Sequence, residues 1–172
     1  MNNISFRAGI PALLFTVAAT TAALPQAAPQ PTAPAAGTEG AAAVAFPMTL
    51  GDMMNTLVQP RHVKLGLAGQ ARNWALAEYA LVELRQTFAG IVKAEPHFRG
   101  LPIGELVDAA VSGPMNAVET AIREQNAKKF AASYAQLTAG CNACHQAAFH
   151  PFVVIKAPAV SAFPDQDFNP RP

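Results

Sequence analysis

Apolar residues recur at steps of three and four along most of the chain after residue 49, which predicts amphipathic helices. The clearest stripe lies in residues 73–94 and consists of Trp74, Ala77, Leu81, Leu84, Phe88 and Ile91. The alternation typical of half-buried strands does not occur, and no hairpin dipeptide separates two apolar runs. The pattern therefore predicts an all-α fold.

Four helices of similar length are predicted, over residues 49–70, 73–94, 102–125 and 126–148. Asn73 suits the N-cap of the second helix, because its side chain can accept a hydrogen bond from a free backbone N–H. Pro60 should kink the first helix, and Pro114 should bend or break the third. Short connections between four such helices favour an antiparallel four-helix bundle.

The N-terminal end has the composition of an export signal followed by a linker. Arg7 is the only charge in the first 38 residues, and an apolar run follows it. We expect residues 1–24 to be a cleaved signal peptide that exports the protein to the periplasm of a bacterium. The run is about 17 residues long, so an uncleaved membrane anchor is the alternative. Residues 25–46 are rich in Ala and Pro and predict a disordered linker.

The C-terminal end, residues 150–172, is interrupted repeatedly by prolines and cannot form a long helix. Its apolar residues Phe152, Val153, Val154, Ile155, Phe163 and Phe168 favour an extended tail packed on the bundle. The predicted domain organisation is thus a signal, a linker, a helical domain over residues 47–149, and this tail.

Charge and cysteine content narrow the function classes. Twelve Lys and Arg against eleven Asp and Glu leave a net charge of +1, so there is no basic excess for binding nucleic acid or an anionic membrane. The chain has two cysteines, three positions apart, which excludes a scaffold held by long-range disulfides.

Candidate chemistry lies in residues 141–145, whose sequence Cys-Asn-Ala-Cys-His has the C-x-x-C-H form of covalent haem attachment. On a helix, Cys141 and Cys144 share one side, where both thiols can reach the two vinyl groups of one porphyrin edge. His145 then projects toward the iron. One covalently bound haem c is the expected cofactor.

Two other interpretations of the motif are open. A redox-active dithiol pair is chemically possible in an exported protein, but that motif accompanies a βαβ unit. A zinc site would need further ligands, and no second Cys or His pair accompanies the motif.

With this motif on the last of four predicted helices, residues 48–150 resemble the class II cytochromes c, meaning cytochrome c′ and its low-spin relatives. The resemblance implies haem attachment at Cys141 and Cys144 and proximal iron ligation by His145. The chain departs from the family pattern in two places. Residues 146–149 lack the basic residue that often follows the motif, and family members usually end soon after it.

The sixth iron position decides between electron transfer and binding of a small gas. In the low-spin members of the family that the chain resembles, a first-helix Met fills it, which points to Met54. His62 is the weaker candidate. The two residues lie about 12 Å apart along a helix, so at most one can reach the iron. Met53 is rotated away from their face, and His97 and His150 are expected in solvent.

We expect a one-electron carrier that serves redox partner proteins and has no catalytic site of its own, because no triad or phosphate-loop pattern occurs. The competing interpretations are a five-coordinate protein that binds nitric oxide or carbon monoxide in a pocket of Met54, Val58 and Leu65, and a haem subunit of a larger oxidoreductase. Peroxidase-like turnover would depend on His62. Pairing of two copies through the first two helices is a further expectation.

Overall fold

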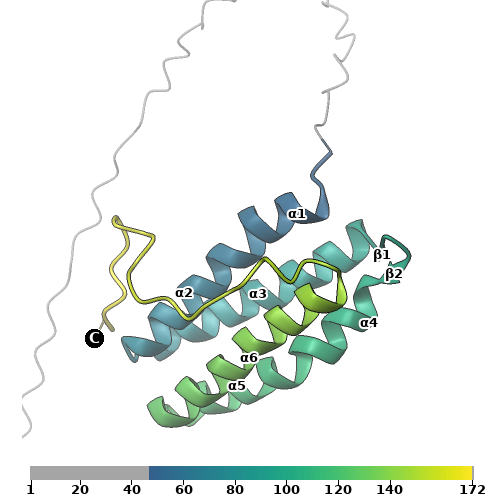
Figure 1. Ribbon diagram of the computed structural model, residues 1–172. Coiled ribbons are helices and arrows are strands. Elements are labelled where there is room, and N and C mark those ends of the chain that lie inside the picture. The colour runs from purple at the N-terminus through teal and green to yellow at the C-terminus, as the bar shows by residue number, and fades with distance from the viewer. Residues whose placement is uncertain (1–46, 172) are drawn as a thin grey trace, which may run out of the picture. The chain divides into compact units, whose positions relative to one another are not determined.

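The computed structural model describes residues 47–171, and the predicted signal peptide and linker, residues 1–24 and 25–46, lie outside the described residues. Helices make up most of the described chain (Figure 1), which confirms the predicted helical class. They are α1 (Leu50–Met53), η1 (Met54–Val58), α2 (Gln59–Gln70), α3 (Trp74–Ala94), α4 (Ile103–Val107), η2 (Asp108–Ser112), α5 (Gly113–Arg123) and α6 (Ala127–Ala147). Within residues 47–171, no helix is long and apolar enough to span a membrane.

Side-chain caps define where the helices begin. Thr49 and Asp52 form a reciprocal capping box at the start of α1. Asn73 accepts a hydrogen bond from the N–H of Leu76 at 3.1 Å, which confirms the predicted N-cap of α3. Asn126 does the same for α6. These caps satisfy backbone donors that would otherwise have no partner.

Two π-helical turns accommodate the prolines within the helices. The π turn η1 directly precedes the α2 segment that carries Pro60, and η2 directly precedes the α5 segment that carries Pro114. A proline lacks the N–H of a regular α-turn and its ring crowds the carbonyl four residues back, so a wider turn relieves both problems. Neither proline therefore ends its helix, so of the bend or break expected at Pro114 the break does not occur.

The connection between the predicted helices over residues 73–94 and 102–125 contains most of a small sheet. Strands β1 (His97–Phe98) and β2 (Leu101–Pro102) pair antiparallel. Arg99 and Gly100 connect them with φ values of 52° and 83°, the pattern of a type I′ turn. The sequence prediction missed this ribbon because two-residue strands are too short to show alternation.

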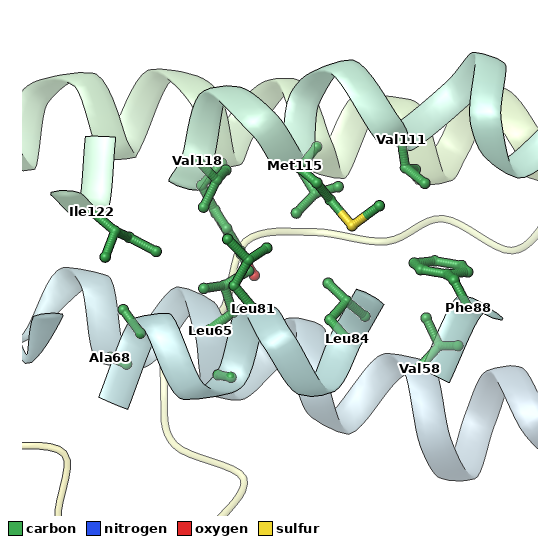
Figure 2. Packing of buried hydrophobic residues seen from close by; sticks show 14 of the residues in the cluster. Val58, Leu65, Ala68, Leu81, Leu84, Phe88, Val111, Met115, Val118 and Ile122 are labelled. Atoms are coloured by element: carbon green, nitrogen blue, oxygen red, sulfur yellow. The ribbon is translucent and has the colours of Figure 1, made fainter. Parts of the chain in front are cut away.

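The core lies between two pairs of adjacent helical segments. The most extensive contacts join α2 to α3 and α5 to α6, and α3 also packs on α5 and α2 on α6. Figure 2 shows the buried side chains meeting in rows between these layers, from Ala68 and Ile122 at one end to Val58, Phe88 and Val111 at the other. Leu65, Val118 and Leu137 in this core have no exposed surface.

The tail leaves the end of α6 and runs back across the helices toward the end of α2 (Figure 1). There, the Gln70 side chain donates a hydrogen bond to the Pro158 carbonyl at 3.0 Å. The ammonium group of Lys64 lies over the Phe163 ring in a cation–π contact, 4.6 Å from the ring centre. Asn73 bonds the carbonyls of residues 168 and 169. A side chain at Gly66 would collide with Pro158 and Tyr134, so the tail lies directly against α2.

Not all of the tail is covered. Ile155, Phe163 and Phe168 are half-buried, but Phe152 is 77% exposed and Val154 is 62% exposed. The expectation that these two would pack on the helices is therefore wrong. Helix side chains hold the tail largely through hydrogen bonds to its backbone, and these two apolar side chains stay in solvent.

Candidate functional site

A cavity of about 60 Å³, partly open to solvent, brings together every candidate ligand. Met54 and His62 reach it from η1 and α2, and Cys141, Cys144 and His145 reach it from α6. The remaining lining residues are Asn55, Val58, Gln59, Phe88, Val107, Val111, Val153 and Ile155. Residues from the first and last helical segments, far apart in the sequence, thus share one site.

The two motif cysteines are free thiols on one side of α6. Burial raises the pKa of Cys141 to about 11, and the neighbouring Cys144 adds to the rise. Burial also raises the pKa of Cys144. Redox-active dithiols depend on a lowered thiol pKa, so this environment gives no support to the dithiol interpretation.

Gly140 lets the motif approach the neighbouring helix closely. A Cβ atom at this position would overlap the carbonyl oxygen of Ala110 in η2. Glycine has no Cβ, so the backbones of α6 and η2 can touch there. Cys141, the next residue, lines the same cavity as Val107 and Val111.

His145 is oriented by the tail. Its Nδ1 lies 2.8 Å from the carbonyl oxygen of Val153. A carbonyl only accepts hydrogen bonds, so Nδ1 carries the proton and donates. In a neutral imidazole the other nitrogen, Nε2, then holds a free lone pair. That is the state in which histidine ligates a metal.

Met54 is half-buried and lines the cavity, whereas Met53 is 8% exposed and packs in the hydrophobic core. The two side chains thus point in different directions, as the helical spacing predicted. Iron ligation by Met54 stays a prediction.

His62 is 2% exposed and has hydrogen-bond partners at both ring nitrogens. Its Nε2 is 3.0 Å from the Thr138 hydroxyl, and its Nδ1 is 3.1 Å from the Tyr134 hydroxyl. The ring also stacks on Tyr134, with 4.7 Å between centroids. Burial lowers the pKa of His62 to about 4, so the imidazole is neutral at pH 7. Ligation by His62 would require one of these hydrogen bonds to be broken.

The cavity walls are mostly aliphatic and aromatic. Val58 and Phe88 face Val111 across the end of the core (Figure 2). Leu65, which the sequence placed in this pocket, is fully buried in the core and does not line it. Sequence reasoning did not name Val111 for this pocket, although it follows Val107 by one four-residue step.

The remaining two histidines lie outside the cavity. His97 is exposed, as predicted. His150 is half-buried between the rings of Phe98 and Phe152, with centroid distances of 5.6 and 5.4 Å. The expectation that His150 is solvated is therefore wrong, because the turn after α6 folds it onto the β1 strand.

The donor set has the groups that the covalently bound haem expected from the C-x-x-C-H pattern would use. Two thiols at one helical face, an imidazole with a free Nε2 and an apolar slot beside them are what haem c attachment needs. Within residues 47–171, no three His, Cys, Asp or Glu side chains come together as a metal-holding group.

Comparison of the chain with protein-family models, with curated proteins and with solved structures finds no match.

Proposed function

We propose that this protein is an exported c-type cytochrome that carries one haem and transfers single electrons. The observation that carries the proposal is the shared cavity: the motif residues Cys141, Cys144 and His145 line it together with Met54. Neither thiol is consumed by a disulfide, and Nε2 of His145 has its lone pair free. An apolar pocket with these few donors suits a flat, mostly apolar cofactor.

In this proposal Cys141 and Cys144 hold the haem through thioether bonds, His145 is the proximal iron ligand, and Met54 is the sixth ligand. A bound haem supplies a reversible one-electron change at its iron. The chain contributes an apolar environment through Val58, Phe88 and the other wall residues, which limits access of water and helps set the potential.

The finer architecture belongs to the same proposal. Contacts of α2 with α3 and of α5 with α6 are those expected of an antiparallel four-helix bundle of the class II cytochrome type. Export to a bacterial periplasm follows from the composition of residues 1–24. Redox partner proteins are proposed to dock where the cavity opens to solvent, beside the exposed residues Asn55 and Gln59.

The direct test is to produce the chain with a haem c maturation system and measure its mass and absorption spectrum. The mass should rise by one haem that survives denaturation, and the spectrum should be low-spin and insensitive to carbon monoxide. Cys141→Ser and Cys144→Ser should each lose one of the two thioether bonds. A wild-type protein that acquires no haem would refute the proposal.

Replacement of Met54 by Ala tests the sixth ligand. The Met54→Ala variant should become high-spin and bind carbon monoxide, because the sixth position of the iron loses its ligand. Its reduction potential should fall, since Met ligation raises the potential of c-type haems. The control is Met48→Ala, because Met48 is 46% exposed and does not line the cavity. An unchanged low-spin spectrum in Met54→Ala would exclude Met54 as the ligand.

Binding of a small gas is the second candidate, and the apolar character of the cavity favours it over peroxidase-like turnover. Apart from the motif residues, its buried lining is aliphatic or aromatic except for His62, whose nitrogens are engaged. A gas molecule bound at an open sixth position of the iron would be surrounded by apolar side chains. A high-spin wild-type spectrum that shifts with nitric oxide or carbon monoxide would move this function to first place.

Peroxidase-like turnover, or a role as haem subunit of a larger oxidoreductase, has less support. A peroxidase would need a polar group free to act on bound peroxide. His62 is the candidate, but Tyr134 and Thr138 occupy its two nitrogens. Loss of turnover in His62→Ala with the haem still attached would be the evidence for such an activity.

A further inference from the structure

The tail crosses the proposed haem motif at residues 153–155 and is bonded to two of the five motif residues. His145 donates from Nδ1 to the Val153 carbonyl at 2.8 Å. Asn142, one helical turn earlier, bonds both backbone groups of Ile155: its Nδ2 donates to the carbonyl at 3.0 Å, and its Oδ1 accepts from the N–H at 2.7 Å. Asn142 therefore has a function that the C-x-x-C-H pattern does not assign.

The double hydrogen bond of Asn142 determines the register of the tail. One side-chain amide meets the donor and the acceptor of a single residue, as a neighbouring strand would. A shift of the tail by one residue would break both bonds and would move the Val153 carbonyl away from His145. The bonds at Asn142 and at His145 therefore depend on each other.

The turn after α6 brings the tail back to the motif. Phe149 has a φ of 63°, and the N–H groups of Phe149 and His150 cap the last turn of the helix. The Val153 N–H then bonds the His150 carbonyl at 3.0 Å and closes a second turn. Beyond the motif, the bond from Gln70 to Pro158 holds the tail at its other side. The segment is thus attached before and after its contact with His145.

We propose that Asn142 and residues 153–155 form a positioning clamp that orients the proximal histidine and lowers the reduction potential of the haem. This inference rests on the proposed function. A carbonyl that accepts a hydrogen bond from the Nδ1–H group makes the imidazole more electron-rich, which favours the oxidised iron. Val153 and Ile155 also line the cavity, so the clamp limits solvent access on that side.

The test is Asn142→Ala in the haem-loaded protein, with Gln146→Ala as the matched control. Gln146 is an exposed residue beside His145 on the same helix. Ala is the best helix former, so neither change should disturb α6. Two quantities are measured: the reduction potential, and hydrogen exchange in the peptide that spans residues 151–157.

In Asn142→Ala, exchange of the 151–157 peptide should become faster. At a fixed solution potential the ratio of oxidised to reduced protein should fall about tenfold, which corresponds to a potential about 59 mV higher. Gln146→Ala should change neither quantity. A potential that stays at the wild-type value while exchange speeds up would refute the clamp, and so would unchanged exchange in Asn142→Ala.

Haem content separates this proposal from the one on which it rests. If the wild-type chain acquires no haem, the proposed function fails and the clamp with it. If wild type and Asn142→Ala both carry covalent haem, the function stands and the two measurements decide on the clamp alone. Loss of haem from Asn142→Ala only would refute the clamp, because it would place Asn142 in attachment instead.

Discussion

At the scale of single residues, burial keeps His62 neutral at the cavity wall, and hydrogen bonds supply partners for its ring nitrogens. The Tyr134 hydroxyl donates to the His62 backbone carbonyl at 2.8 Å and lies within reach of the ring as well. Thr138 partners the other nitrogen. Every buried side-chain polar atom in the described residues has a hydrogen-bond partner, so no polar group of this network is buried without one.

The depressed pKa of His62 predicts how stability changes with pH. The value is about 4 in the folded protein against an ordinary 6.5, so the unfolded chain binds more protons between these two pH values. The free energy of unfolding should therefore fall as the pH drops through this window, by at most roughly 1.4 kcal/mol per pH unit. Above about pH 6.5 this contribution is fully present.

Chemical unfolding of wild type and His62→Gln at several pH values measures the effect. The other titratable groups are the same in both proteins, so the difference between the two slopes isolates His62. His97→Gln is the control, because His97 is exposed. Equal slopes for wild type and His62→Gln would contradict the depressed pKa.

At the scale of elements, the two π turns and one glycine shape the cavity. Met54 and Val58 belong to η1, and Val111 belongs to η2, so each π turn contributes wall residues. Such turns are frequent at functional sites because they change the direction of side chains without ending the helix. Gly140 then brings the motif helix against η2.

Gly140→Ala should destabilise the protein by about 1–3 kcal/mol, the usual cost of overpacking. The added methyl group would overlap the Ala110 carbonyl, and backbone cannot move aside as a flexible side chain can. Gly90→Ala is the matched control: a Cβ atom there would meet no atom within 4 Å, and Ala favours the helix by up to about 1 kcal/mol. Thermal unfolding compares the two. A Gly140→Ala protein as stable as wild type would contradict the close contact.

At the scale of the whole molecule, the tail covers part of the surface of α2 and α3, which a second copy of the protein would need for pairing through these helices. It contacts Lys64 and Gln70 of α2 and the Asn73 cap of α3. Tyr79 and Val82 of α3 remain 62% and 44% exposed. Pairing of two copies through these helices stays a prediction, and it would have to use this apolar pair.

Val82→Lys tests the pairing, because a charge at the centre of an apolar contact is costly to bury. At a concentration where half of the wild-type protein is dimeric, the variant should be mostly monomeric by analytical ultracentrifugation. Val160→Lys makes the same change at a tail residue that is 80% exposed, and it should not alter the mass distribution. A wild-type protein that stays monomeric at all concentrations would refute pairing.

Much of the helical structure was predictable because its signals are local. The Asn73 cap, the apolar steps and the prolines act within a few residues, so the predicted helix ranges agree closely with those observed. The π turns were not predictable, since a proline can also be accommodated by a kink.

The sequence by itself determined the candidate chemistry and the helical class. Spacing alone put Cys141, Cys144 and His145 on one stretch of helix, because that relation depends only on helical geometry. Only the tertiary structure decided which distant residues meet there. Met54 lines the same cavity, Leu65 does not, and the tail supplies the acceptor for His145. These relations arise from packing between segments far apart in the chain, which no local pattern specifies.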